Sequence, residues 1–138
     1  MLVYIILLVV YLIISIGIHE FAHAFAADRL GDPTARAMGR LTLNPLAHID
    51  LLGTVILPLS LLLFSAVSGV SFVFGWGKPT PFDPYNLKNP RRDAAIISIA
   101  GPISNILLAI AVSILLRFTP YVFSIFLVPL IRTNIGLA

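Results

Sequence analysis

An H-E-x-x-H motif, formed by His19, Glu20 and His23, lies inside a long apolar segment at the start of the chain. The two histidines are four residues apart, so on a helix they share one face about one turn apart. Both imidazoles can then hold one metal ion, and the intervening glutamate can reach a water bound to that metal. This spacing predicts a zinc site with a general base beside it.

The surroundings of the motif strengthen this interpretation. Apart from two tyrosines, the motif supplies the only ionisable side chains in residues 1–27. Counted back from Asp28 at about 1.5 Å per residue, His23 lies roughly 7 Å and His19 roughly 13 Å inside the apolar stretch. Ionisable groups at such depth are costly and usually functional. The alternatives are a polar cluster that packs helices together and the proton relay of a transporter.

The composition indicates a membrane protein of one domain. Hydrophobic residues make up 59% of the 138 residues and charged residues only 11%, far from the balance of a soluble globular chain. The net charge of +3 suits loops at lipid headgroups, and no basic cluster interleaved with aromatic residues points to nucleic acid. The absence of cysteine excludes a disulfide framework and a thiolate metal site.

We therefore expect an all-α membrane protein with three to four transmembrane helices. The helices are expected at about residues 2–27, 51–74, 94–116 and 121–131, joined by polar connections at 28–50 and 75–93. The first would be about 39 Å long, more than a ~30 Å hydrocarbon core requires. The fourth is short for a span.

Two stretches of the polar connections suggest β-structure. Residues 35–43 alternate loosely between apolar and polar side chains and are expected as a short strand. Residues 71–82 are expected as a strand or hairpin in the interfacial loops, because prolines that include Pro79 and Pro81 prevent a continuous helix there. The alternative for this second stretch is an interfacial loop anchored by Trp76.

Three further polar residues are candidate supporting residues. His48 and Asp50 precede the second apolar segment, where they either cap and hold the loop or lie near the metal. Asn105 places an amide at membrane depth, either as a hydrogen-bonding group between helices or as a donor to a developing oxyanion.

Seven stretches of the sequence carry a further pattern. They lie at residues 18–28, 30–36, 39–50, 53–58, 74–82, 86–91 and 100–105, the last reading A-G-P-I-S-N. Together they resemble the site-2 protease family of intramembrane zinc metalloproteases. The resemblance implies a helical core in the membrane, with an aspartate ligand in a motif of the type N-x-x-P-x-x-P-x-D-G. This motif is missing here, and residues 134–138 look like those just before it. The resemblance thus implies a core that is C-terminally incomplete before its third zinc ligand.

By this resemblance, the chain is expected to be a multi-pass integral membrane protein, of the cell membrane if bacterial. It would be an intramembrane zinc endopeptidase that cleaves membrane-spanning proteins, with His19 and His23 as Zn²⁺ ligands and Glu20 as general base. An exposed strand edge at residues 71–82 could receive the unwound substrate by β-augmentation. The alternatives are a transporter or proton-relay protein and an inactive, protease-derived membrane scaffold. The expected partners are a transmembrane substrate and the lipid bilayer, with no nucleic acid, and a homo-oligomer is left open.

Overall fold

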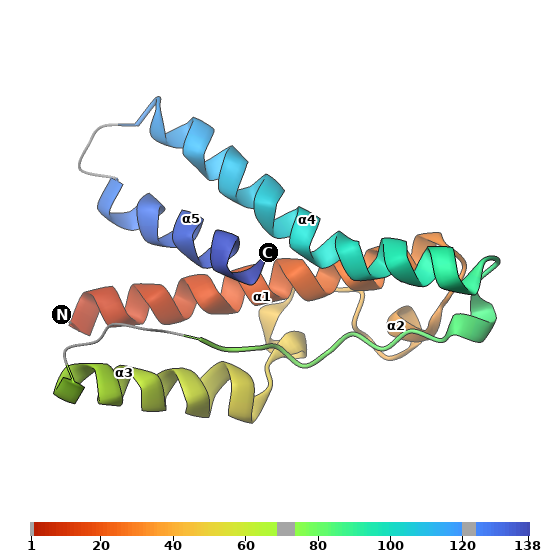
Figure 1. The fold of residues 1–138 in the computed structure, drawn as a ribbon, viewed down its shortest axis with the longest axis horizontal. Coiled ribbons are helices and arrows are strands. Elements are labelled where there is room, and N and C mark those ends of the chain that lie inside the picture. Colours follow the sequence, from red (N-terminus) through yellow and green to blue (C-terminus); the bar gives the residue numbers. More distant parts are fainter. Residues whose placement is uncertain (1, 69–73, 120–123) are drawn as a thin grey trace.

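The computed structural model describes residues 2–68, 74–119 and 124–138, and every regular element within these ranges is a helix (Figure 1). The longer helices are α1 (Leu2–Arg29), α3 (Leu57–Ser68), α4 (Pro90–Leu116) and α5 (Ser124–Leu137). Shorter helical turns connect them: α2 (Thr34–Ala37), η1 (Pro45–His48), η2 (Leu51–Ile56) and η3 (Pro84–Asn86). The expected all-α class is therefore confirmed for the described residues.

Two helices are long and apolar enough to cross a membrane. They are Ile6–Arg29 within α1 and Pro90–Leu116, of 24 and 27 residues. At 1.5 Å per residue, each exceeds the ~30 Å thickness of a hydrocarbon core. The apolar helices at Leu51–Ser65 and Phe126–Leu137 are shorter. The expected count of three to four spans is thus not confirmed, whereas two candidate spans are present.

The ends of α1 and α4 have the chemistry of helix termini. α1 ends before Gly31, whose φ of +107° is a conformation that glycine adopts without a steric penalty. α4 begins at Pro90, where the missing N–H of proline costs no hydrogen bond, and the Asp93 carboxylate accepts a 2.9 Å hydrogen bond from the N–H of Asn89. With these ends fixed, the H-E-x-x-H motif lies in the second half of α1.

Helices α1, α4 and α5 pack against one another, and α3 lies on the other side of an extended segment at residues 74–83 (Figure 1). Ala24 and Ala27 of α1 are fully buried, and small residues let helix backbones approach closely. Beyond the motif, Ala27 packs with Leu87 and Ile97 in a small apolar cluster. The second half of α1 is therefore held between α4 and the loops.

The second and fourth apolar segments have boundaries that differ from the expected ones. The segment expected as one helix over 51–74 begins as the π-helix η2 and is helical only to Ser68, while Phe74 belongs to the extended segment. Pro58 has no N–H to donate to the preceding turn, which accounts for irregular helix geometry before it. In place of a helix over 121–131, α5 begins at Ser124 and continues to Leu137, while residues 121–123 lie outside the described residues.

The two stretches expected as β-structure are not strands. A short strand was expected at residues 35–43. That prediction is wrong, because the stretch begins within the short helix α2. The second is extended over 74–83 but pairs with no described strand, and its residues 71–73 lie outside the described ranges. Its backbone makes single hydrogen bonds to the loops, from Trp76 N–H to Gly53 O and from Lys78 N–H to His48 O. Prolines remove the donors that a regular ladder would need, so the hairpin is not confirmed.

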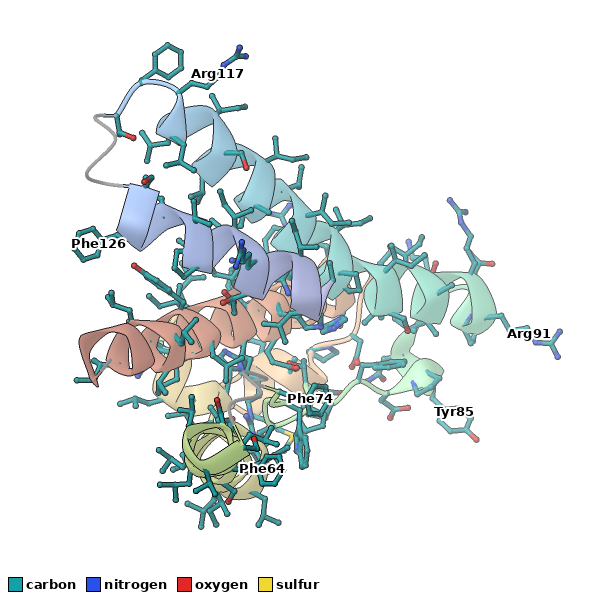
Figure 2. All side chains as sticks on the ribbon, turned by 60° about the vertical axis from the view of Figure 1, so that its left-hand side comes forward. Phe64, Phe74, Tyr85, Arg91, Arg117 and Phe126 are labelled. Atoms are coloured by element: carbon teal, nitrogen blue, oxygen red, sulfur yellow. The ribbon has the colours of Figure 1, made fainter. Side chains whose placement is uncertain are left out.

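The outer faces of the helices are apolar. Figure 2 shows Phe64 and Phe126 projecting away from the bundle, where they are 64% and 44% exposed. Arg91 and Arg117 project at opposite ends of α4, and residues 94–116 between them contain no charged side chain. An apolar outer surface with charges at the helix ends suits a bilayer better than water.

Candidate metal centre

The two histidines of the motif converge on one point of α4. Their rings lie with centroids 4.7 Å apart in a T-shaped arrangement on α1. A Cβ atom placed on Gly101 would lie 2.3 Å from Nε2 of His23 and 2.5 Å from Nε2 of His19. Both Nε2 atoms therefore lie close to the same residue of α4, and the two rings can approach it this closely because residue 101 has no side chain.

α4 also holds the opposite nitrogen of each ring. Nδ1 of His23 hydrogen-bonds the carbonyl oxygen of Ile97 at 2.7 Å, and Nδ1 of His19 lies 3.0 Å from the side-chain amide of Asn105. Ile97, Gly101 and Asn105 are spaced four residues apart and share one face of α4. Partners at Nδ1 fix the orientation of a ligating imidazole and leave Nε2 free for a metal.

The side-chain amide of Asn105 can hold Nδ1 of His19 if the amide oxygen, rather than the nitrogen, faces the imidazole ring. An imidazole that ligates through Nε2 carries its proton on Nδ1 and needs an acceptor there. The amide nitrogen faces His19, and the fully buried Oδ1 has no hydrogen-bond partner among the described residues. Because the two ends of an amide are assigned from their hydrogen bonds, a 180° turn gives Nδ1–H an acceptor.

The carboxylate of Glu20 is held by the extended segment. Glu20 is only 9% exposed, and its Oε2 accepts a 2.8 Å hydrogen bond from the backbone N–H of Thr80. The hydroxyl of Thr80 donates to the backbone carbonyl of Glu20 at 3.0 Å. One carboxylate oxygen is thus fixed, while Oε1 makes no hydrogen bond within the described part of the chain.

Glu20 lies between two cavities. A cavity of about 350 Å³ is lined by His19 and Glu20 of α1 and by Gly75, Gly77 and Pro79 of the extended segment. A second, of about 240 Å³, is lined on the other side by Glu20, His23 and Pro79. Glu20 and Pro79 therefore border both spaces, and each space also borders one of the histidines.

His48 and Asp50 have structural contacts away from the two histidines. His48 is fully buried in the loops, where Nε2 lies 2.9 Å from the carbonyl oxygen of Thr42. Asp50 is the N-cap of η2 and accepts a 2.7 Å hydrogen bond from the N–H of Gly53. Among the residues proposed from the sequence, the structure thus brings together His19, Glu20, His23 and Asn105.

The geometry fits two of the protein ligands of a catalytic zinc ion. Such a zinc takes three protein ligands and keeps a position for water. In the ranges that the structure describes, no three His, Cys, Asp or Glu side chains form a group that could hold a metal. Asp83 and Asp93, the other nearby carboxylates, cap η3 and α4. The described residues therefore offer His19 and His23 as candidate ligands and no candidate for a third.

Asp32 connects the end of α1 to the segment that holds Glu20. This fully buried carboxylate accepts four hydrogen bonds, two from Thr34, one from the side chain of Asn86 and one from the N–H of Asp83. Burial opposes the ionisation of Asp32, but these hydrogen bonds outweigh it and lower its pKa below the ordinary value. Asp32 thereby anchors the end of the extended segment at Asp83, three residues beyond Thr80.

Two residues of this centre were not predicted from the sequence. Gly101 lies in the A-G-P-I-S-N stretch, which counted only toward the resemblance, and α4 continues through Pro102. Thr80 acts through its backbone N–H, which carries no signal in residue type. The extended pattern of residues 71–82 was the only indication that backbone groups there remain available.

The comparison with protein families agrees with this geometry. The sequence model of Peptidase family M50 matches residues 7–133. The matched range includes the H-E-x-x-H motif and the positions of Gly101 and Asn105 opposite it. The chain belongs to peptidase family M50. Proteins of family M50 are membrane proteases, in agreement with the two candidate spans.

Curated relatives of the chain are named as zinc metalloproteases. YwhC of Bacillus subtilis is 44% identical over 102 residues, which make up 74% of this chain and 41% of YwhC. Rip2 of Mycolicibacterium smegmatis is 35% identical over 101 residues, or 71% of this chain and 35% of Rip2. Rip2 of Mycobacterium tuberculosis is 33% identical over 97 residues, which make up 70% of this chain and 34% of Rip2. The match thus covers well under half of each relative. No solved structure gives a significant match.

Proposed function

We propose that this chain carries the zinc-binding helix and the general base of an intramembrane endopeptidase that hydrolyses peptide bonds of membrane-spanning proteins. The observation that carries the proposal is that Nε2 of His19 and Nε2 of His23 lie close together beside Gly101. Each ring is held at Nδ1, so both are oriented before any metal binds. Membership in family M50 and the names of the relatives support the same chemistry.

His19 and His23 would be two of the zinc ligands. When bound, zinc lowers the pKa of a coordinated water to about 7 and polarises the carbonyl of the substrate. Glu20 would accept the proton of that water at Oε1 and deliver it to the departing amine. Because Thr80 N–H holds Oε2, the carboxylate stays oriented while Oε1 exchanges the proton.

Asn105 has a positioning role in this proposal. Its side-chain amide lies 3.0 Å from Nδ1 of His19 and is fully buried, so water cannot replace it easily. An acceptor at this position keeps His19 in the tautomer that ligates through Nε2. Since the amide is engaged by the imidazole, we assign it to ligand orientation rather than to donation to an oxyanion.

The substrate is proposed to be a transmembrane segment that unwinds locally. A peptide bond inside a helix is shielded and its polar groups are hydrogen-bonded, so hydrolysis requires an extended conformation. The extended segment at 74–83 borders the cavity beside Glu20 and could take up such a strand by β-augmentation. The apolar outer faces of α3 and α4 support a multi-pass protein in the bilayer.

The proton-relay alternative has weaker support. A relay needs ionisable groups that face one another across helices. The groups of α4 that face the motif histidines are a backbone carbonyl, at Ile97, and a neutral amide, at Asn105. These groups suit the orientation of metal ligands, and no proton-carrying side chain of α4 takes their place in the described residues.

Zinc stoichiometry of the purified chain in detergent tests the proposal. The wild type should bind about one zinc per chain, and His19→Gln and His23→Gln should each lose it. His48→Gln is the matched control, because this third histidine is buried in the loops and should leave zinc binding intact. Equal zinc binding by His19→Gln and His48→Gln would contradict the assignment of the ligands.

A further inference from the structure

Three basic side chains line one cavity at the end of the bundle where α1 ends and α4 begins. The cavity has a volume of about 360 Å³, and its charged lining consists of Arg29 from α1, Lys88 from the turn before α4, and Arg92 and Asp93 from α4. Figure 1 shows the two helix ends at the same end of the molecule. Cations from three segments of the chain are thus brought to one space by the packing of α1 on α4.

The neighbouring carboxylates leave this cluster positively charged. Asp93 is 5% exposed, and its carboxylate accepts the hydrogen bond from the N–H of Asn89 at the start of α4. Asp28 forms an ion pair with Arg36 instead. Within the part of the chain that the structure describes, none of the three cations forms an ion pair, and all three are exposed. Three cations and one carboxylate give the lining a net charge of +2, so a bound anion would relieve their repulsion.

The cavity lies at the level where both candidate spans end. Arg29 is the last residue of the span in α1, and Arg92 lies in the first turn of the span in α4. The guanidinium group of Arg29 lies 4.7 Å from the centre of the Phe25 ring, one turn back toward the apolar part of α1. Lipid headgroups occupy this level of a bilayer, and basic pockets between transmembrane helices bind anionic headgroups.

A stripe of isoleucines on α4 leads away from the cavity. Ile96 lines the cavity and is 42% exposed. Three further residues follow at intervals of three or four, so they share one face of the helix, and they are between 47% and 52% exposed: Ile99, Ile103 and Ile106. From Ile96 to Ile106 the helix rises about 15 Å, half of the ~30 Å hydrocarbon core and therefore the depth of one lipid leaflet. An acyl chain that starts at the cavity would find an apolar path of matching length, which a free phosphate ion would not use.

We propose that the cavity at Arg29, Lys88 and Arg92 binds the headgroup of an anionic phospholipid, whose acyl chain lies along the isoleucine stripe of α4. The guanidinium and ammonium groups donate hydrogen bonds to the phosphate, and each guanidinium can donate two in parallel. The lipid connects the end of α1 to the start of α4. Ile97, whose carbonyl holds Nδ1 of His23, directly follows the last cavity residue of α4. The lipid site goes beyond the proposed function and requires neither zinc nor cleavage.

Thermal unfolding followed by circular dichroism tests the site, with phosphatidylglycerol as the probe. The purified chain is held in a non-ionic detergent, and phosphatidylglycerol or zwitterionic phosphatidylcholine with the same acyl chains is added. Phosphatidylglycerol should raise the melting temperature by about 5 °C or more at saturation, because a ligand that binds only the folded state stabilises it. Phosphatidylcholine should raise it much less, because its choline group opposes the three cations. Equal shifts with the two lipids would overturn the recognition of an anionic headgroup.

Inorganic phosphate distinguishes a lipid from a free anion. At the same concentration as phosphatidylglycerol it should leave the melting temperature unchanged, because it has no acyl chain to place on the isoleucine stripe. If inorganic phosphate reproduces the whole shift, the cavity is a site for a free anion and the assignment of a lipid is wrong.

A pair of double variants tests the location of the site. Lys88→Gln with Arg92→Gln removes two cations of the cavity, and Arg91→Gln with Arg117→Gln is the matched control. The control also removes two exposed charges at the ends of α4, but Arg91 and Arg117 project from the helix and do not line this cavity (Figure 2). The cavity variant should lose at least half of the shift with phosphatidylglycerol, whereas the control should keep it. Equal losses would show that the lipid is attracted to basic charge in general, and would overturn the site.

Native mass spectrometry provides a second measurement that does not depend on the stability of the variants. One phosphatidylglycerol should remain bound to each wild-type and control chain, and none to the cavity variant. Retention of the lipid by the cavity variant would overturn the roles of Lys88 and Arg92. His19→Gln should retain the lipid like the wild type, since the cavity is separate from the metal ligands.

Discussion

The backbone N–H of Thr80 donates a 2.8 Å hydrogen bond to the carboxylate of Glu20, although the two residues are 60 positions apart. A second hydrogen bond, from the hydroxyl of Thr80 to the carbonyl of Glu20, doubles this connection. The general base proposed for this chain is therefore oriented by the segment that would bind the substrate. Displacement of that segment should alter the base even where no zinc ligand is touched.

Replacement of Thr80 by proline should impair cleavage without removing zinc. Thr80→Pro deletes the N–H that holds Glu20, and a hydrogen bond to a charged group contributes about 1.5–3 kcal/mol. Cleavage of a transmembrane reporter should then fall roughly 10- to 100-fold. Thr80→Val keeps the N–H and is the control, expected to retain most of the activity. Equal cleavage rates for the two variants would show that the backbone contact does not orient Glu20.

Asn105→Ala should weaken zinc binding while leaving the helices intact. The substitution removes the group that holds Nδ1 of His19, and loss of such outer contacts typically costs 10- to 100-fold in metal affinity. Zinc affinity can be measured by competition with a chelator, and helicity by circular dichroism. Ser113→Ala is a suitable control, because in the described part of the chain this hydroxyl bonds only the carbonyl of Ala109, within α4. An unchanged zinc affinity in Asn105→Ala would remove the positioning role.

The sequence predicted what depends on local pattern. The spacing of His19, Glu20 and His23 on a helix follows from periodicity, and the long apolar runs predicted α1 and α4. Asp50, at the junction of a polar loop and an apolar run, was recognised as a candidate N-cap and is one. These features need no knowledge of which elements pack together.

The features that the sequence could not predict depend on how helices and loops far apart in the sequence pack against one another. That Gly101 faces both histidines follows from the register of α4 on α1, which no local signal encodes. His48 looked like a candidate near the metal, but the loop buries it against Thr42 instead. Residues 71–82 were expected as a strand or hairpin. The described part instead attaches by single contacts to Gly53, His48 and Glu20, because its prolines leave too few donors for a ladder.

Asp32→Asn should destabilise the fold and make its free energy of unfolding less dependent on pH in the acidic range. Because hydrogen bonds lower the pKa of Asp32 in the folded state, its contribution is fully present above the unfolded pKa of about 3.9. It is lost as the pH falls through the lower, folded value. In Asp32→Asn the N–H of Asp83 faces an amide NH₂ and loses its acceptor, at a cost of about 1–3 kcal/mol at neutral pH.

Thermal unfolding followed by circular dichroism between pH 7 and pH 3 checks this prediction. The difference in melting temperature between wild type and Asp32→Asn should be constant near neutrality and shrink below about pH 4. Asp28→Asn is the control, since Asp28 pairs with Arg36, a largely exposed partner, and should cost less than about 1 kcal/mol. A difference that grows as the pH falls would have the wrong sign for a lowered pKa.

Gly101→Ala should abolish zinc binding more completely than the loss of Asn105. The new methyl group would lie 2.3 Å from Nε2 of His23 and 2.5 Å from Nε2 of His19, so it would collide with both rings. Both rings would have to turn away, against the hydrogen bonds at their Nδ1 atoms. The chain should remain helical, because alanine favours a helix over glycine by about 1 kcal/mol.

Gly136→Ala separates this steric effect from the change in helix propensity. Gly136 lies in α5, and a Cβ atom there would meet nothing within 4 Å. The variant should therefore bind zinc like the wild type and unfold at the same or a slightly higher temperature. The prediction is checked by measuring the zinc stoichiometry of Gly101→Ala and Gly136→Ala under the same conditions. If Gly101→Ala retains zinc as Gly136→Ala does, the space beside Gly101 is not where the two histidines hold the metal.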